Sequence, residues 1–431
     1  MRVLILGGGA ALHALAWKLV SAPQVEQIYC SPGNAGTALL AGRPPFSPER
    51  SAEIAQWAFA QQMDLVVVQG MPEWVDLLAG VGLAVLGVGE HAWRALGSRQ
   101  SMRELLQPRQ IPCVQGRTFR DLEMAERYLA SRRLPLWIRP DDATQSQAVR
   151  VEERLGGFQE LARLLSLDPE GGVSIEDAMP GPEVALALLS DGQRGLSCGV
   201  SRIYSCRYEG ETGPATEGMG AYAPYGAPTL EEELMETLGR PVLAALAGAG
   251  LLGPTFVQLR IVLGETGPVL RDLAWGLDDL HAAVVLPRWD VDLAGLLQAA
   301  ARGHLEGIPP AWRPGVAVAV AMVAEGYPGP SPEGQPLPGL YEIEALVFHH
   351  ATRLQAEDSP AALGPLSSWL RPAAPPRPIE MARPAVTEGG RVLLVVGLAP
   401  TGAEARSKAY QGVAGLTFPH CAWRQDIAVE L

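Results

Sequence analysis

The stretch VLILGGGAALHALAWKLV, residues 3–20, decides the architecture of the N-terminal part of the chain. Its first four residues, 3–6, are apolar and predict a short buried strand, and the three glycines at 7–9 predict a tight turn. From residue 10 to residue 20 the apolar side chains recur at helical spacing, so we expect a helix that follows the turn directly. Strand, turn and helix in this order are typical of an α/β domain with a parallel sheet.

The rest of the chain first repeats this alternation and later changes to strands that follow one another. The further strands predicted by apolar runs are residues 25–30, 64–68, 135–138, 173–176, 184–190, 255–263, 269–273, 316–324 and 391–397. The predicted helices are residues 51–62, 98–107, 231–248, 292–303 and 402–413. Segments rich in proline and glycine at 309–314, 326–339 and 359–384 predict a boundary and two loops.

Composition excludes several classes of protein. The chain has 431 residues and a formal net charge of −13, whereas nucleic-acid binding usually needs a basic surface, so no nucleic-acid partner is expected. The longest apolar run, 316–324, is far shorter than the roughly 20 residues of a membrane span. Five cysteines without a CxxC pair indicate reduced thiols in a cytoplasmic protein. Only Lys18 and Lys408 are lysines, so chemistry in the middle of the chain cannot use one.

Motifs in a fixed order relate the chain to a known family. Residues 13–19 read HALAWKL, 32–37 read PGNAGT, 213–224 read GPATEGMGAYAP and 284–293 read VVLPRWDVDL. These segments, with GGRVL at 389–393, resemble those of phosphoribosylamine–glycine ligases, which read GGGGREHALAWKL, PGNAGT, GPNTGGMGAYSP and VVLPRLDSDL. The resemblance runs from residue 1 to about residue 427, so it covers nearly the whole chain.

The resemblance implies an α/β and α+β multidomain protein of the ATP-grasp type. The expected modules are an N-terminal parallel-sheet α/β domain (1–98), the ATP-grasp lobes (99–305) and a C-terminal α+β domain (306–431). It also implies that glycine is joined to 5-phosphoribosylamine in purine synthesis with ATP and Mg²⁺, by a monomer or a homodimer.

The nucleotide-binding positions can be carried over one by one. The lysines of the family patterns SKxxxK and VVKADG fall at Arg99, Arg103 and Arg139. Arginine keeps the positive charge, but its planar fork makes the exchange chemically distinct. The hinge beside adenine and the residue near the ribose follow on the next strands. The residues expected to bind ATP are Arg99, Arg103, Arg139, Glu176, Met179 and Glu183.

The substrate-binding positions lie in the glycine-rich segments. Glycines before a helix can hold a phosphate through backbone N–H groups, although a plain tight turn explains them equally well. His13 is likewise open to a structural explanation, as a histidine on an apolar helix face. The positions that the resemblance assigns to substrate are Gly8, Gly9, His13, Asn34, Gly36, Thr37, Thr216, Gly218 and Met219.

The phosphate lid departs from the family pattern. Where the family has ADGLAAGKGV, residues 140–149 read PDDATQSQAV, without a glycine or a lysine. Glycine lets a lid approach phosphate closely, so its loss weakens the expected cradle. We expect Asp141 and Asp142 to face the polyphosphate instead.

The metal site departs as well. The family segment VLEFNCRFGDPETQVVLPR aligns with residues 270–288, which places the metal-binding Glu at Asp272 and the metal-binding Asn at Ala274. Ala274 has no ligand atom. A register slipped by one residue would put Arg271 and Leu273 there, and a ligand is lost either way. The family's Asp survives as Asp279, which together with Arg139 is expected to serve catalysis.

Two further sites are altered. The Arg-Glu pair of the first loop is replaced by Ala11 and Leu12, and the basic pattern DHKRxxDGD falls on residues 203–211, where only Arg207 could compensate. Four changes around one pocket lead us to expect ligase activity that is reduced or lost. The alternative is a non-catalytic paralogue that binds a ligand or a partner on the same scaffold.

Overall fold

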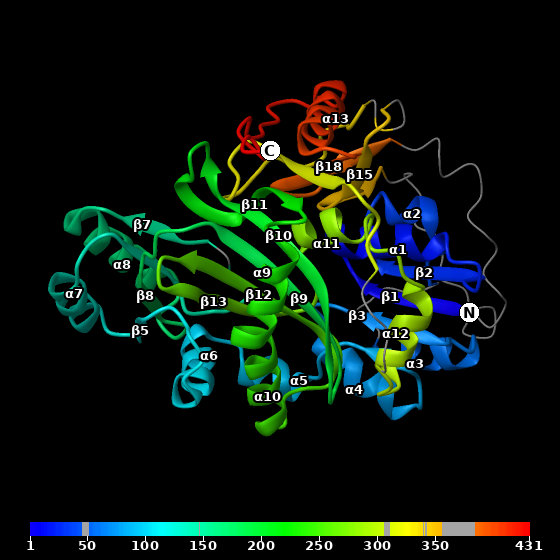
Figure 1. Ribbon diagram of the computed structural model, residues 1–431, viewed down its shortest axis with the longest axis horizontal. Helices are drawn as coiled ribbons and strands as arrows, with labels where there is room; N and C mark the ends of the chain where they lie inside the picture. Colours follow the sequence, from blue (N-terminus) through cyan, green and yellow to red (C-terminus); the bar gives the residue numbers. More distant parts are fainter. Residues whose placement is uncertain (45–50, 146, 306–310, 339, 341–342, 356–383) are drawn as a thin grey trace.

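The computed structural model describes residues 1–44, 51–145, 147–305, 311–338, 340, 343–355 and 384–431. The N-terminal part is a four-stranded parallel sheet of order β2-β1-β3-β4 with helices on both faces (Figure 1). Side chains of β1 alternate: Val3 and Ile5 pack with α1, and Leu4 and Leu6 pack with α3 and α4. The elements are β1 (Arg2–Gly7), α1 (Gly9–Val20), β2 (Gln27–Pro32), α2 (Thr37–Leu40), α3 (Ser51–Ala60), β3 (Leu65–Val68), α4 (Pro72–Gly80), β4 (Val85–Leu86) and α5 (Glu90–Ala95).

A small antiparallel lobe follows, at the left of Figure 1, and its sheet has the order β5-β8-β6-β7. One face of the sheet is closed by two helices, because Leu136 and Ile138 pack with Leu129 and Leu161 in one core. The other face of the sheet lines the cleft between this lobe and the large central sheet. The elements are α6 (Arg99–Leu106), β5 (Gly116–Phe119), α7 (Leu122–Ser131), β6 (Leu136–Pro140), β7 (Val149–Val151), α8 (Arg154–Leu167) and β8 (Val173–Asp177).

An eight-stranded sheet, antiparallel at every pairing, forms the centre of the molecule, with the order β13-β12-β9-β10-β11-β14-β18-β15. The last three strands of this order come from the C-terminal part of the chain, so they continue the sheet of the ATP-grasp part. The strands are β9 (Glu183–Asp191), β10 (Gly195–Tyr208), β11 (Thr212–Ala223), β12 (Pro254–Gly264), β13 (Gly267–Trp275), β14 (Val316–Val323), β15 (Leu346–His349) and β18 (Arg391–Ala399).

Helices join this sheet to the rest of the molecule. Buried α11 packs against α1 and the large sheet in one core, which fixes the carboxylates at its N-terminus beside the glycine-rich loop. The remaining elements are α9 (Pro228–Leu234), a π-helical segment (Met235–Gly239), α10 (Arg240–Gly248), α11 (Asp279–Val285), α12 (Leu293–Ala301), β16 (Thr352–Leu354), β17 (Ala385–Thr387), α13 (Gly402–Gly415) and a 3-10 turn (Gln107–Arg109).

The architecture expected from the sequence is confirmed, including the antiparallel sheets between residues 173 and 275. Two local differences stand out. The single helix predicted for 231–248 begins earlier, at Pro228, and is interrupted by the π-helical segment. The long strands β10 and β11 were not predicted, because their glycines and polar residues hide the apolar alternation. The predicted loop at 359–384 lies, except for its last residue, outside the described residues. Within the described ranges, no helix is both long and apolar enough to span a bilayer.

Candidate nucleotide and substrate site

Arg139 connects the small lobe to the large sheet. On β6 it leaves the sheet on the face opposite Leu136 and Ile138, so its side chain enters the cleft. Its guanidinium lies 2.6 Å from Glu176 of β8 and 2.7 Å from Asp272 of β13. Because the Arg139 side chain is only 1% exposed, these are buried ion pairs. The three residues are therefore brought together as the sequence predicted, but Arg139 is bound to protein carboxylates.

Arg99 and Arg103 lie one helical turn apart on α6, whose N-terminus is capped by Ser98. Arg99 donates to the carbonyl oxygens of Pro140 (2.8 Å) and Gln145 (2.6 Å), and its Nε lies 3.3 Å from Asp272. Arg103 donates to Glu176 at 2.9 Å, and also to the hydroxyl groups of Thr118 and Ser174. The two helix arginines hold the lid and the hinge strand in place.

A β-bulge brings Arg271 into the cleft together with Asp272. Arg260 pairs with Asp272 and Ile261 pairs with Leu270, which leaves Arg271 as the extra residue on β13. Arg271 forms an ion pair with Glu183, and its Cζ lies 5.4 Å from the ring centroid of Trp137. The structure places Asp272 in the cleft, whereas Leu273 is buried in the core, as expected for the first of the two sequence registers.

The ion pairs continue toward the glycine-rich loop. Arg260 lies 3.0 Å from Glu183 and 2.6 Å from Asp278, and it also donates to the carbonyl of Glu217 at 3.4 Å. Arg391 donates to the same carbonyl at 3.0 Å and lies 3.2 Å from the Glu217 carboxylate. The network thus joins the two ends of the cleft. Its arginines are Arg99, Arg103, Arg139, Arg260, Arg271 and Arg391, and its carboxylates are Asp141, Glu176, Glu183, Glu217, Asp272, Asp278 and Asp279.

The charges of this network compensate one another. Burial opposes the ionisation of Asp272, but Arg139 and Arg99 outweigh it and hold the pKa of Asp272 well below its usual value. Burial lowers the pKa of Arg99 to about 10, and the neighbouring Arg139 acts in the same direction. Among the described residues, six arginines face seven carboxylates, so these arginines carry no surplus of positive charge.

A cavity of about 480 Å³ lies on the side of the hinge strand. Its walls include Met179 and Gly181 after the hinge, and Trp137 and Arg271 from facing strands. Trp137 stands where the family pattern VVKADG has valine, and Arg271 stands where VLEFN has leucine. The cavity is therefore present where a nucleotide base is expected, with two larger side chains on its wall.

The residues present do not fit a bound magnesium ion. Asp272 is engaged by Arg139, Arg99 and Arg271, and Ala274 contributes no oxygen. Within the described parts of the chain, no group of three or more His, Cys, Asp or Glu side chains could hold a metal. The arginines at the phosphate-binding positions already have protein carboxylates as partners.

One of the two lid carboxylates lies elsewhere than the sequence predicted. Asp141 is fully buried, accepts hydrogen bonds from Thr118 Oγ1 (2.8 Å) and Gln100 N (3.2 Å), and does not face the cleft. The prediction that it faces a polyphosphate is wrong, because the carboxylate anchors the start of α6. Asp142 accepts bonds from the backbone and the hydroxyl of Thr144, at 2.8 and 2.7 Å, which stabilises a local turn.

The loop after β2 is held together by its own side chains. Asn34 Oδ1 accepts from Gly36 N (3.0 Å) and Thr37 N (2.9 Å), and its Nδ2 donates to the carbonyls of Gly9 and His349. His13 is buried and accepts from His349 N at 2.9 Å. Burial keeps the pKa of His13 well below its usual value, with His349 adding to the effect. These residues meet as predicted, but their side chains shape the loop.

Asp279, at the start of α11, lies against the glycine-rich loop at Gly9. The Asp279 carboxylate accepts from Ala11 N at 2.6 Å and lies 2.5 Å from Arg391 and 2.9 Å from His350 Nδ1. Burial opposes its ionisation, but His350 and Arg391 keep the pKa of Asp279 well below its usual value. Gly9 lies against the same carboxylate, which therefore occupies the N-terminus of α1. A cavity of about 400 Å³ opens beside Glu217, His350 and Arg391.

The signature segment of β11 contributes a shaped backbone. Thr216 Oγ1 donates to the carbonyl of Ser205 and accepts from Gly218 N at 2.9 Å. Gly218 has φ +113°, and a Cβ there would lie 2.4 Å from Leu280 Cδ1, so no larger residue fits. Met219 is buried in the core. Arg207, which could have replaced the lost basic cluster, instead donates to the carbonyl of Tyr327 at 3.0 Å.

Several residues of the cleft were missed by sequence reasoning. Trp137, Glu217, His350 and Arg391 were not assigned a role, although Arg391 was quoted as part of GGRVL. A signal was available for Glu217, which replaces the first glycine of GPNTGG. Trp137 could have been found from its place two residues before Arg139, on the same face of a strand.

The small antiparallel lobe, the cleft and the large sheet define an ATP-grasp protein. Models of three domains of phosphoribosylglycinamide synthetase match the chain: the N domain at 1–100, the ATP-grasp (A) domain at 97–273 and the C domain at 317–430. A phosphoribosylamine–glycine ligase of Nostoc sp. is 31% identical over 99% of both chains. One of Brucella melitensis is 30% identical over 99% of this chain and 97% of its own. The chain belongs to the phosphoribosylamine–glycine ligase family of purine biosynthesis.

Solved structures agree in fold. A phosphoribosylamine–glycine ligase of Thermotoga maritima has a TM-score of 0.78 at 23% identity, covering 99% of this chain and 100% of its own. The biotin carboxylase domain of the 2-oxoglutarate carboxylase of Hydrogenobacter thermophilus, in complex with MgADP and bicarbonate, has a TM-score of 0.66 at 13% identity, covering 98% and 91%. At these identities the likeness concerns the fold alone.

Proposed function

We propose that this chain keeps the scaffold of phosphoribosylamine–glycine ligase but joins glycine to 5-phosphoribosylamine slowly or not at all. One observation carries the proposal. Asp272, at the position of a metal ligand, is paired with Arg139 and Arg99, while Ala274 offers no second ligand. The arginines at the phosphate-binding positions and the carboxylate at the metal position therefore neutralise one another.

The chemistry of the family explains why this pairing matters. Activation of the glycine carboxylate transfers a phosphoryl group from ATP, and such transfer is accelerated almost entirely by positioning and by electrostatic stabilisation. Removing one preorganised group of this kind costs roughly 10²–10³ in rate. Here a metal ligand and the glycine-rich lid are both missing, so we expect a large combined loss even if the effects are not additive.

We further propose that the chain consists of the modules 1–98, 99–305 and 306–431 and binds ATP and Mg²⁺ weakly. We propose that it is a cytoplasmic protein, as a monomer or a homodimer. The bounds of the three family matches support the division, and the five free cysteines are compatible with reduced thiols. The roles given to individual site residues remain predictions.

A non-catalytic paralogue is the second candidate function. It is favoured by Trp137 and Arg271, which narrow the cavity expected to hold the base, and by Glu183, whose two carboxylate oxygens are paired with Arg260 and Arg271. In that case the scaffold binds a ligand or a partner without turning it over.

Genetic complementation separates an active ligase from an inactive one. A plasmid carrying this gene is placed in a bacterial strain that lacks phosphoribosylamine–glycine ligase, with the Nostoc relative as the positive control. We expect no growth without added purine. Calorimetry with ATP, with and without Mg²⁺, is expected to give weak binding that Mg²⁺ does not strengthen. Growth on minimal medium, or low-micromolar binding that requires Mg²⁺, would refute the proposal.

A restoration series identifies the cause of the loss. One variant carries Asp272→Glu with Ala274→Asn, a second carries the lid sequence ADGLAAGKGV at 140–149, and a third adds Trp137→Val and Arg271→Leu to both. Activity regained only in the third variant supports a decayed catalytic centre. Full activity from the first variant alone would show that the lid and the cavity walls are not limiting.

A further inference from the structure

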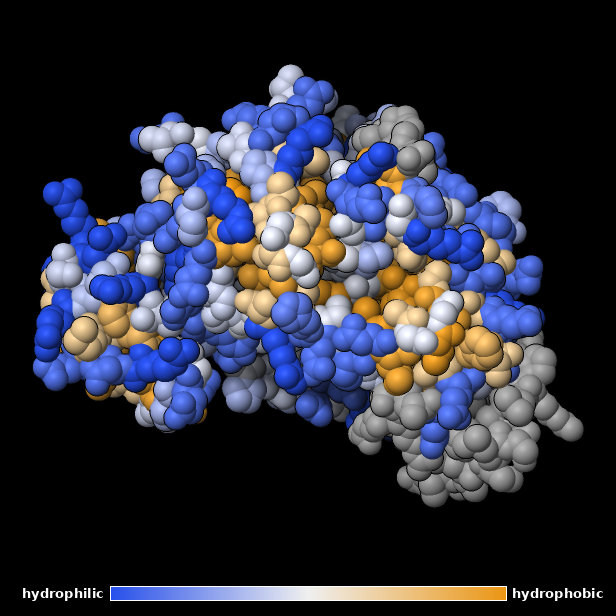
Figure 2. All heavy atoms as spheres, turned by 90° about the horizontal axis from the view of Figure 1, so that it is seen from below, coloured by the Kyte–Doolittle hydropathy of each residue, from blue (hydrophilic) through white to orange (hydrophobic). Residues whose placement is uncertain are grey.

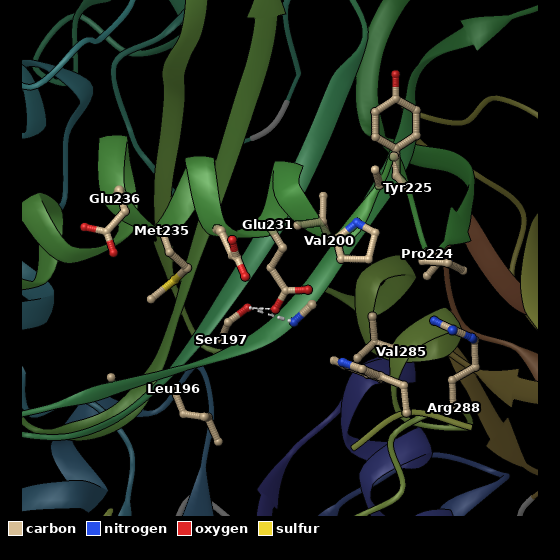
Figure 3. A pocket seen from close by; sticks show the side chains of 18 of the residues that line it. Leu196, Ser197, Val200, Pro224, Tyr225, Glu231, Met235, Glu236, Val285 and Arg288 are labelled. Atoms are coloured by element: carbon tan, nitrogen blue, oxygen red, sulfur yellow. Dashed lines mark hydrogen bonds between the residues drawn. The ribbon is translucent and has the colours of Figure 1, made fainter. Parts of the chain in front are cut away.

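A cavity of about 640 Å³ lies away from the cleft, between the start of β10 and the segment that leads into α9 (Figure 3). It shares no lining residue with the nucleotide cavity or with the cavity beside Glu217. Its volume is in the range of small-molecule sites, which are mostly apolar with a few polar groups. Neither Ala274, where the metal ligand is lost, nor the lid lines this cavity. Ligand binding in this cavity therefore does not depend on the proposed function.

Arg288 supplies an unusual positive charge to this cavity. Its side chain is 7% exposed, and it donates to the carbonyls of Gly315 (2.9 Å) and Arg313 (3.4 Å). Among the residues that the structure describes, no carboxylate forms an ion pair with its guanidinium, and no charged group contributes to the shift of its pKa. In Figure 3 the guanidinium points toward Pro224. A buried charge is costly without a counter-charge, and burial lowers the pKa of Arg288 accordingly.

Glu231 supplies the opposite charge from α9. Its carboxylate accepts a hydrogen bond from Ser197 Oγ at 2.5 Å, a neutral donor that holds the group in place without cancelling its charge. The neighbouring Glu236 already has a partner, since it lies 2.8 Å from Arg240. Figure 3 shows Glu231 and Arg288 on different sides of the cavity, with Val200 and Val285 between them.

The wall between Arg288 and Glu231 is apolar, and its side chains are closely packed. Trp312 stacks on Trp289 with centroids 6.0 Å apart, and Arg288 lies over the Trp312 ring at 5.8 Å. Gly199, at φ +85°, leaves room for Trp312, because a Cβ there would lie 2.8 Å from the ring. Met235 lines the opposite side from the π-helical segment, a local distortion that is frequent at functional sites.

We propose that this cavity binds a small zwitterion whose ammonium and carboxylate groups are separated by an apolar body, the chemistry of an apolar dipeptide. The carboxylate contacts Arg288, the ammonium contacts Glu231, and the apolar side chains lie against Val200, Tyr225 and Trp312. A ligand with one charge would leave the other group of the protein without a partner, so both charges contribute to recognition.

Three related probes test the assignment by calorimetry on the full chain. They are leucyl-leucine, its N-acetyl form without the ammonium, and its C-terminal amide without the carboxylate. We expect leucyl-leucine to bind at least tenfold more tightly than either blocked form. Glu231→Gln should weaken leucyl-leucine and the amide about tenfold but leave the acetylated peptide unchanged. Arg288→Gln should weaken leucyl-leucine and the acetylated peptide but leave the amide unchanged.

Two further variants keep the test decisive if Arg288→Gln does not fold. Ala227→Trp fills the mouth of the cavity from an exposed position and should abolish binding of all three probes. Glu236→Gln at the rim is the matched control and should leave binding within twofold. Absence of saturable binding at millimolar leucyl-leucine would overturn the proposal. So would equal binding of the free and the blocked peptides.

Discussion

Arg139 of the small lobe and Asp272 of the large sheet meet at 2.7 Å across the cleft, and their side chains are 1% and 25% exposed. This ion pair connects the small lobe to the large sheet across the cleft. Arg99 also lies 3.3 Å from Asp272, and Arg139 has a second partner in Glu176 at 2.6 Å, so Asp272 pairs with two buried cations. The position expected to bind a metal thus holds the lobes together.

Removal of this carboxylate should destabilise the protein strongly. Asp272→Asn leaves Arg99 without its ion-pair partner and Arg139 with Glu176 alone, and breaking a buried pair costs about 3–5 kcal/mol. Urea unfolding at pH 7 measures the change. The control is Glu90→Gln, which breaks the exposed pair with Arg94 and should cost about 0.5 kcal/mol or less. Equal losses in the two variants would mean that the cleft pair contributes no more than a surface pair.

The same substitution should improve the binding of polyphosphate. With Asp272 neutral, Arg139 and Arg99 keep free donors in a buried site, and charge-assisted bonds to phosphate are strong. We expect Asp272→Asn to bind inorganic tripolyphosphate about tenfold more tightly than the unmodified chain, without added metal. Asp142→Asn is the control, because its carboxylate stabilises a local turn and should have a smaller effect. Unchanged affinity in Asp272→Asn would argue against charge compensation as the cause of weak binding.

The fold was predictable from the sequence because its signals are local. Apolar runs such as residues 64–68 and the glycine turn at 7–9 define strands and turns without help from distant residues. The ATP-grasp architecture was predicted from the family motifs, which occur along the chain in a fixed order. The partners inside the cleft were not predictable in the same way. Arg271 enters it only because β13 carries a bulge, and no pattern in residues 267–275 indicates that bulge.

The structure brings several of the predicted site residues together, but their bonding partners were not predicted. Asn34, Thr37 and His13 lie together as the motifs predicted, but their hydrogen bonds are made within the protein, with partners up to 336 residues away in sequence. Asp141 is the clearest failure. It aligns with a lid residue, yet it is buried against α6, where Thr118 and Gln100 both donate to its Oδ1.

Gly36 should not tolerate a side chain. A Cβ at this position would lie 2.1 Å from His13 Cε1 and 2.7 Å from His349 Cδ2, and both rings are buried. Gly36→Ala should therefore cost about 1–3 kcal/mol through overpacking, measured as a lower midpoint of urea unfolding. Gly80→Ala, where nothing lies within 4 Å, should be neutral or slightly stabilising. A neutral Gly36→Ala would show that the loop moves away from α1 without strain.

Buried histidines should make the protein less stable as the pH falls from 7 to 5. Burial lowers the pKa of both His281 and His349 to about 4, whereas the unfolded chain has a histidine pKa near 6.5. Between these values the unfolded state binds more protons than the folded state, so stability rises with pH and falls on acidification. Each histidine then removes about 2 kcal/mol between pH 7 and pH 5. The low pKa values of Asp272 and Asp279 act only below this window, since those carboxylates lose their contribution when they protonate.

A single substitution isolates one of these contributions. His281 Nδ1 lies 2.8 Å from Ser201 Oγ, so His281→Gln keeps a polar partner for the hydroxyl but removes the titrating ring. The variant should lose about 2 kcal/mol less than the unmodified chain between pH 7 and pH 5, as measured by urea unfolding at each pH. If the slopes of the His281 variant and the unmodified chain coincide, the buried ring is not what makes this protein sensitive to acid.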